Sequence, residues 1–205
     1  MILGTLLQGI PVVNRQFAGG AFDWLSPFGL LAGIGLLITY ATLACGWLIM
    51  KTDGDLQRRI YVAMKPMAWI LLGLIAAVSG WTVLGDAAIA RRWFALPDLF
   101  FFLPVPVLVL ACVLGIQRAL RQKRDRQPFV LTAAILFLGY TGLIISIFPN
   151  IIPPSLDIWA ASSPRSSQLF TLFGAAIIVP IILGYSAMAY WVFRGKVRHD
   201  DPGYH

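Results

Sequence analysis

The stretch LFTLFGAAIIVPIILGYSAMAYWVF, residues 169–193, decides the fold class of this chain. It contains no Asp, Glu, Lys, Arg or His. Its length is sufficient for the hydrocarbon core of a bilayer, which needs about 20 apolar residues in an α-helix. A segment inside a membrane must satisfy its own backbone hydrogen bonds, which favours a helix over an isolated strand. The sequence therefore predicts a transmembrane helix here.

Four further segments have the same apolar character, near residues 27–50, 67–85, 99–117 and 129–152. We therefore predict an all-α protein, a polytopic membrane bundle of about five transmembrane helices, which forms a single integral-membrane domain over residues 1–205. The composition agrees, because 59% of the residues are hydrophobic and 12% are charged. Soluble domains average about 45–50% apolar and about 25% charged residues. We expect helix kinks at Pro104, Pro106 and Pro180.

The Lys and Arg residues between these segments predict an orientation. Alternate connections carry 4 of them on one side of the membrane and 12 on the other, which accounts for all 16. Cytoplasmic connections carry the excess of Lys and Arg in membrane proteins. We therefore expect a multi-pass protein with a cytoplasmic C-terminus and an N-terminal arm outside. This distribution also explains the net charge of +7, and we expect no binding of nucleic acid.

Residues 1–13, MILGTLLQGIPVV, are apolar but too short to span a bilayer. They lack the positively charged start of a signal peptide. We interpret them as the last turns of a helix, and we expect the sequence to be the C-terminal part of a larger membrane protein.

The residue types that carry redox or transport chemistry are absent from the predicted spans. Both histidines, His199 and His205, lie in the C-terminal tail, whereas haem inside a membrane usually takes His as an axial ligand. Ion pathways need buried ionisable groups, which these spans lack. Cys45 and Cys112 stand alone in apolar segments and indicate small buried side chains. We therefore expect no catalytic, metal or cofactor site formed by this chain alone.

The connection PPSLDIWAASSP, residues 153–164, is a polar and aromatic loop between two apolar segments. We expect Pro153 and Pro154 to end the helix before it. Trp159 is interpreted as an anchor at the membrane interface. Ser162 or Ser163 is expected to cap the next helix, with Pro164 in its first position.

The end of the first span contributes further candidate residues for structure or partner contact. We interpret Lys51 as a side chain that reaches the interface, and Gly54 as the glycine that ends the helix. The complete set of candidates for the structure or the partner interface is Trp47, Lys51, Thr52, Gly54, Asp157, Trp159, Ser162 and Ser163.

Several segments together resemble subunit II of the cytochrome bd quinol oxidases. They are WLSPFGLLAGIGLLITYATLACGWLIMKTDGDL (24–56), preceded by QGIPVVNRQFAGGAFDWL (8–25), then FPNIIPPSLDIWAASSP (148–164) and IIVPIILGYSAMAYWVFRGKV (177–197). The family loop usually reads Trp-Asp-Ala-Ser-Ser, whereas here Ala160 follows Trp159 and the acidic residue comes earlier, at Asp157.

This resemblance implies a membrane fold of eight helices, of which this chain would hold helices four to eight. It implies a role in the respiratory chain of a bacterial inner membrane, in a complex that oxidises quinol and reduces dioxygen to water. In that family haem b and haem d belong to subunit I, the implied partner. Subunit II is a haem-free scaffold that holds a structural quinone in some members.

Two alternatives remain open at this point. The chain could be a small membrane transporter or permease-like subunit, although substrate coupling usually needs a buried ionisable group. It could also be a non-functional truncated fragment that inserts but does not assemble.

Overall fold

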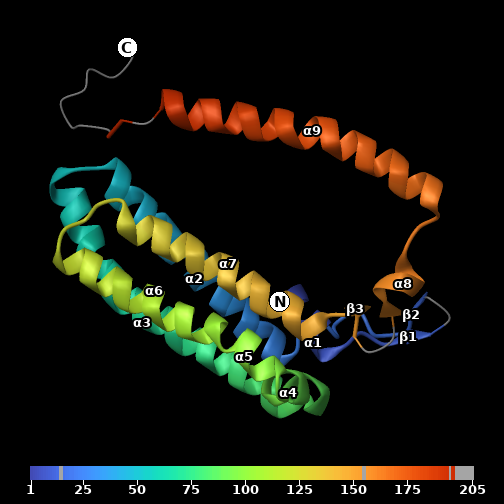
Figure 1. Ribbon diagram of the computed structural model, residues 1–205. Coiled ribbons are helices and arrows are strands. Elements are labelled where there is room, and N and C mark those ends of the chain that lie inside the picture. Colours follow the sequence, from blue (N-terminus) through green and yellow to red (C-terminus); the bar gives the residue numbers. More distant parts are fainter. Residues whose placement is uncertain (14–15, 154–155, 194, 197–205) are drawn as a thin grey trace.

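A computed structural model describes residues 1–13, 16–153, 156–193 and 195–196. The described part of the chain is dominated by helices, and five of them are long and apolar enough to cross a membrane (Figure 1). The long helices are α2 (Pro27–Lys51), α3 (Gly54–Gly85), α6 (Pro104–Arg121), α7 (Gln127–Ile147) and α9 (Arg165–Val192). The prediction of an all-α membrane bundle is confirmed.

Short elements connect the long helices. The short helices are α1 (Ile2–Gln8), α4 (Ala87–Phe94), α5 (Asp98–Phe102) and α8 (Ile158–Ala161). The strands β1 (Val12–Val13) and β2 (Gln16–Phe17) form one antiparallel pair, and β3 (Asn150–Ile152) and β4 (Leu156–Asp157) form another. Residues 1–13 thus form a short helix followed by a strand. Both strand pairs lie at one end of the bundle, close to α8 (Figure 1).

Local sequence sets several helix starts. Ser26 precedes α2, and its hydroxyl accepts a hydrogen bond from the Gly29 backbone N–H at 2.9 Å, with Pro27 in the first position. The carboxylate of Asp86 caps α4 through the Ala88 N–H at 2.7 Å. Pro104 and Pro106 lie in the first turn of α6, where proline is tolerated, so they mark the break after α5. The kink expected at these prolines is therefore a helix start.

The second span begins much earlier than residue 67, because α3 starts at Gly54. Its 32 residues extend about 48 Å at 1.5 Å per residue, which exceeds the ~30 Å hydrocarbon core. The first turns carry Arg58, Arg59 and Lys65. Hydropathy therefore located the apolar part of α3 and missed its polar extension.

The fourth span ends earlier than residue 152. Helix α7 stops at Ile147, and Phe148 has an extended backbone (ψ 139°) immediately before Pro149, as expected for a residue that precedes proline. Residues 150–152 pair with β4 instead of continuing the helix. The prediction that Pro153 and Pro154 end this helix is wrong, because Pro149 already does so. Pro154 lies outside the described residues.

Two predicted helix caps are also wrong. Thr52 is the C-cap of α2, whereas Gly54 is the first residue of α3, where a φ of +67° favours glycine. Helix α9 begins at Arg165 after Pro164, and no side chain caps it. The Ser162 hydroxyl instead donates to the Trp159 carbonyl at 2.9 Å, within the preceding turn.

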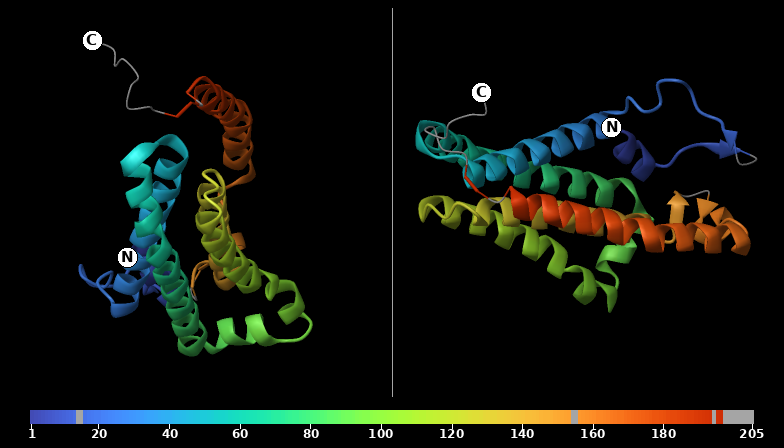
Figure 2. Two further views of the ribbon diagram at one scale, coloured as in Figure 1. Left: turned by 90° about the vertical axis from the view of Figure 1, so that its left-hand side faces the viewer. Right: turned by 90° about the horizontal axis from the view of Figure 1, so that it is seen from above.

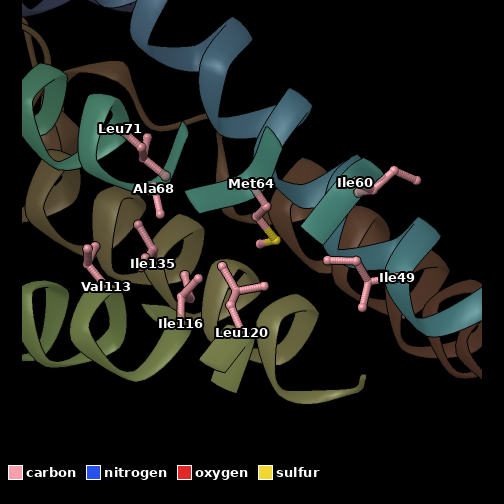
Figure 3. Close-up of a cluster of buried hydrophobic side chains, with 9 residues drawn as sticks. All are labelled: Ile49, Ile60, Met64, Ala68, Leu71, Val113, Ile116, Leu120 and Ile135. Atoms are coloured by element: carbon pink, nitrogen blue, oxygen red, sulfur yellow. The ribbon is translucent and has the colours of Figure 1, made fainter. Parts of the chain in front are cut away.

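The buried core lies between α2, α3, α6 and α7 (Figure 3). Its side chains recur at helical spacing on α3 and on α6, so that one face of each helix is turned inward. The cluster consists of Ile49, Ile60, Met64, Ala68, Leu71, Val113, Ile116, Leu120 and Ile135.

Glycine allows two close helix contacts. A Cβ at Gly46 of α2 would lie 2.8 Å from the Phe129 Cα of α7, and a Cβ at Gly4 of α1 would lie 2.9 Å from the Gly29 Cα. A Cβ at several other glycines of the spans would have nothing within 4 Å; these are Gly73, Gly80, Gly139, Gly174 and Gly184. The small-residue contacts of this bundle are therefore local, as membrane helix packing often is.

Helix α9 lies to one side of the other four long helices (Figures 1 and 2). The structure describes all 28 of its residues, and none of them is buried. After its polar first turn, residues 165–168, apolar residues predominate along the helix. Its contacts with the other helices lie at its C-terminal end, near Lys51, and its N-terminal end follows the turn that carries Trp159.

Candidate functional site

One group of candidate residues lies where α2, α3 and α9 meet the α6–α7 connection. We refer to this end of the bundle as the Lys51 end. The Lys51 ammonium donates to the Phe193 carbonyl, at the end of α9, and to the Gly195 carbonyl at 3.2 Å. The same nitrogen lies 5.3 Å from the centroid of the Trp47 ring, one turn earlier on α2. Lys51 therefore binds the end of α9 and does not simply extend to the interface.

Trp47 connects three helices at this end. Its ring packs edge-on against Phe129 of α7, with centroids 5.3 Å apart, and against Tyr190 of α9, with centroids 5.8 Å apart. Edge-to-face pairs at such distances are favourable beyond the area that they bury. Trp47 thus provides an aromatic contact between α9 and the core bundle.

Asp125, in the α6–α7 connection, receives two side chains from other elements. Its carboxylate accepts a hydrogen bond from the Tyr61 hydroxyl of α3 at 2.7 Å and forms an ion pair with Lys196. Partial burial raises the pKa of Asp125, but the hydrogen bonds from Lys196 and Tyr61 outweigh it and hold the pKa below its usual value. We call Lys51, Tyr61, Asp125 and Lys196 the terminal clasp.

The carbonyls at the C-terminus of α9 explain why Lys51 binds there. The last carbonyls of a helix lack partners within the helix and carry partial negative charge. Lys51 supplies both a donor and a positive charge there. Arg92 of α4 acts similarly on α7, since its guanidinium donates to the carbonyls of Ile145 at 3.1 Å and Ser146 at 3.2 Å.

The second group of candidates lies at the opposite end, which we call the Trp159 end. The β3–β4 pair aligns Asn150 with Asp157, and the Ile158 N–H donates to the Pro149 carbonyl at 3.0 Å. The Asp157 carboxylate caps α8 by accepting from the Ala160 N–H at 2.6 Å. Asp157 therefore orients the turn that carries Trp159.

Trp159 is presented to the surroundings by this turn, with 70% of its surface exposed. Ser162 and Ser163 lie beside it, and the Ser163 carbonyl accepts from the Gln168 side chain at 2.7 Å. The Trp159 ring points outward from a capped turn. Such a ring is suited to contact with another molecule or with the lipid headgroup region.

An apolar cavity of about 570 Å³ lies between α1, α2, α3, α4, α6 and α7. Its lining includes no Asp, Glu, Lys, Arg or His side chain. Three of its hydroxyls, on Thr39, Thr82 and Ser146, donate to carbonyls of their own helices at 2.7–2.9 Å. The cavity therefore suits an apolar chain and offers little to a charged substrate.

The predicted candidates thus separate into two places. Trp47, Lys51, Thr52 and Gly54 lie at the Lys51 end, where the Thr52 hydroxyl donates to the Leu48 carbonyl at 2.7 Å. Asp157, Trp159, Ser162 and Ser163 lie at the Trp159 end. In the described part of the chain, no three His, Cys, Asp or Glu side chains are grouped to hold a metal ion.

Sequence reasoning missed Tyr61, Arg92, Asp125 and Lys196. A signal existed for Asp125, because it is the single acidic residue among the basic side chains of residues 118–126. No signal in the sequence indicated that its partners would come from α3 and from the segment after α9.

Comparison with known proteins identifies relatives over nearly the whole chain. Residues 1–193 match the family described as cytochrome bd terminal oxidase subunit II. Cytochrome bd-I ubiquinol oxidase subunit 2 of Escherichia coli K12 is 27% identical over 97% of this chain and 61% of that protein.

Two further relatives have similar coverage. Cytochrome bd ubiquinol oxidase subunit 2 of Bacillus subtilis is 25% identical over 98% of this chain and 60% of that protein. The probable cytochrome oxidase subunit 2 of Haemophilus influenzae is 26% identical over 95% of this chain and 60% of that protein. The chain therefore spans about three fifths of the length of these curated relatives.

Proposed function

Because this chain belongs to the cytochrome bd terminal oxidase subunit II family, we propose that it is a haem-free membrane subunit of a quinol:oxygen oxidoreductase. In this role it packs against a haem-bearing subunit I, which oxidises quinol and reduces dioxygen. This chain contributes helices and docking surface and no catalytic residue. Haem b and haem d belong to the partner.

The observation that carries this proposal is the surface of α9. A helix of 28 residues with no buried residue is well suited to contact with lipid and with a second membrane subunit. The terminal clasp and Trp47 contact the C-terminal end of this helix, and the exposed Trp159 lies on α8, shortly before its first residue. Interfaces often depend on such large aromatic anchors.

We propose that the Lys51 end faces the cytoplasm of a bacterial cell and that Trp159 faces the opposite side of the plasma membrane. The support is the excess of Lys and Arg on the connections at the Lys51 end. A green fluorescent protein fused after residue 205 is expected to fluoresce, because this reporter matures in the cytoplasm. A dark fusion that is present in the membrane would reverse the orientation.

The quinone that the family suggests fits the apolar cavity in part. The lining suits an isoprenoid tail, and Leu72, Ile75 and Ile135 are among its walls. The hydroxyls of Thr39, Thr82 and Ser146 are already used as donors to their own helices. We therefore assign to this cavity the holding of an apolar tail, with no part in electron transfer.

Co-expression with the adjacent subunit I tests the proposal. An affinity tag on this chain is expected to recover both polypeptides together, with the absorbance of haem b and haem d. Two results would contradict it. Recovery of the chain alone, with solute transport in vesicles, would favour a transporter subunit. Recovery alone and without activity would favour a non-functional fragment.

A further inference from the structure

Exposed cations are concentrated at the Lys51 end of the bundle. They lie on the first turns of α3, on the last turns of α6 and in the α6–α7 connection, and within the described residues none of them forms a salt bridge. Three carboxylates are near them in sequence. Asp125 forms its ion pair with Lys196, and Asp53 and Asp55 lie at the start of α3. The cations are Arg58, Arg59, Lys65, Arg118, Arg121, Lys123, Arg124 and Arg126.

Three of these cations share one side of the α3–α6 pair. The two helices are in register here, because the Gln117 side chain of α6 donates to the Lys65 carbonyl of α3 at 2.8 Å. Arg58 lies two turns before Lys65 on the same face of α3, and Arg121 lies one turn after Gln117 on the same face of α6. We call Arg58, Lys65 and Arg121 the basic face.

Exposed apolar side chains continue this face toward the middle of the bundle. Trp69 lies one turn beyond Lys65 and is 49% exposed, and Leu114 lies two turns before Arg121 and is 50% exposed. Tryptophan favours the boundary between headgroups and hydrocarbon. Arg58 and Lys65 precede the apolar stretch of α3, which begins at Met67, and Leu114 lies within the apolar part of α6.

We propose that the basic face binds an anionic phospholipid. The guanidinium groups of Arg58 and Arg121 and the ammonium of Lys65 contact the headgroup phosphate, and the acyl chains lie against Trp69 and Leu114. Basic pockets between transmembrane helices recognise anionic headgroups in this way. An excess of cations on the cytoplasmic connections is enough to orient the protein in the membrane. It does not explain why cations and an exposed tryptophan lie together on one side of the α3–α6 pair.

The test uses the full chain in neutral detergent, with phosphatidylglycerol or phosphatidylcholine added and bound lipid measured by native mass spectrometry. We expect retention of phosphatidylglycerol and not of phosphatidylcholine. Each of R58Q, K65Q and R121Q is expected to weaken phosphatidylglycerol binding about fivefold. The matched control, R91Q with R165Q, removes exposed cations at the Trp159 end and is expected to change nothing.

Two further measurements keep the proposal falsifiable if a glutamine variant folds poorly. The charge-preserving variant R121K is expected to bind phosphatidylglycerol within about twofold of the native chain, since a lysine near the surface contributes as an arginine does. Inorganic phosphate at millimolar concentration is expected not to displace the lipid. Equal binding of both lipids, loss of binding in the control, or displacement by free phosphate would each overturn the assignment.

Discussion

At the residue scale, the close approach of α2 to α7 depends on Gly46. The backbone of α7 at Phe129 occupies the space that a side chain at this position would need. Gly73, also in a transmembrane helix, has nothing within 4 Å of the corresponding position. Both residues are glycines in the apolar part of a helix, so they form a matched pair.

We expect Gly46→Ala to destabilise the bundle by about 1–3 kcal/mol, the usual cost of overpacking. Gly73→Ala is expected to be neutral or slightly stabilising, because alanine favours helices by about 1 kcal/mol over glycine. Unfolding of both variants in mixed micelles, followed by circular dichroism, measures the difference. Equal stability of the two variants would contradict the close contact between α2 and α7.

The sequence indicated these residues only in general terms. A glycine-rich membrane chain suggests close helix packing, but only the arrangement of α2 beside α7 distinguishes Gly46 from Gly73. The sequence places Lys51 at the end of the first span, but it does not predict the bonds of this side chain to the end of α9. Those bonds join residues more than 140 positions apart, and periodicity within one helix carries no information about such pairs.

At the element scale, α9 contacts the other helices at its C-terminal end. The terminal clasp contacts its C-terminal end, its N-terminal end follows the turn that Asp157 caps, and none of its residues is buried. The Asp125–Lys196 ion pair is partly exposed, with side chains 32% and 36% accessible, so its contribution to overall stability is small. The ion pair instead positions the end of α9, and we expect this positioning to depend on pH.

The lowered pKa of Asp125 fixes the direction of this dependence. A carboxylate whose pKa is lower in the folded state stabilises that state above the unfolded value of about 3.9, and the effect is lost as the pH falls through the folded value. We therefore expect the end of α9 to stay in place at neutral pH and to be released below about pH 4.

Distances between spin labels at Val192 and Gln127 measure this release, with Cys45 and Cys112 replaced by serine. The native distribution is expected to be narrow at pH 7 and to broaden in acid. Asp125→Asn is expected to broaden it already at pH 7, whereas Asp53→Asn leaves it narrow. A narrow distribution in Asp125→Asn would show that the ion pair does not position α9.

The elements themselves were predictable to the extent that hydropathy controls them. All five spans were found because lipid requires long apolar helices. The predicted boundaries were wrong where a helix continued through polar residues and where apolar residues formed a strand. Residues 54–66 are helical although several of them are charged, and Ile151 and Ile152 are extended although apolar. The separate position of α9 could not be predicted, because its composition equals that of a packed membrane helix.

At the scale of the whole molecule, the Trp159 end offers the sharpest test of a partner surface. Trp159 is 70% exposed and Trp81 is 46% exposed, with the Trp81 ring 5.8 Å from that of Phe28 in the same chain. If Trp159 contacts subunit I, Trp159→Ala should weaken assembly by about 2 kcal/mol or more. Trp81→Ala is expected to have a smaller effect.

Recovery of subunit I with each tagged variant, over a dilution series, gives the comparison. Equal recovery from both variants would reduce the Trp159 turn to a surface feature without a partner. If only Trp81→Ala lowers the recovery of subunit I, the interface with subunit I includes the side of α3 that carries Trp81.

The proposed function is that this chain supports the redox chemistry of a haem-bearing subunit I; the apolar parts of its five spans hold no histidine or charged residue. The most direct measurement is the haem content per polypeptide, by the pyridine haemochrome method, in membranes that contain the chain alone and the chain with subunit I. We predict no haem with the chain alone and haem b and haem d with the pair. Stoichiometric haem bound to the chain alone would contradict the account.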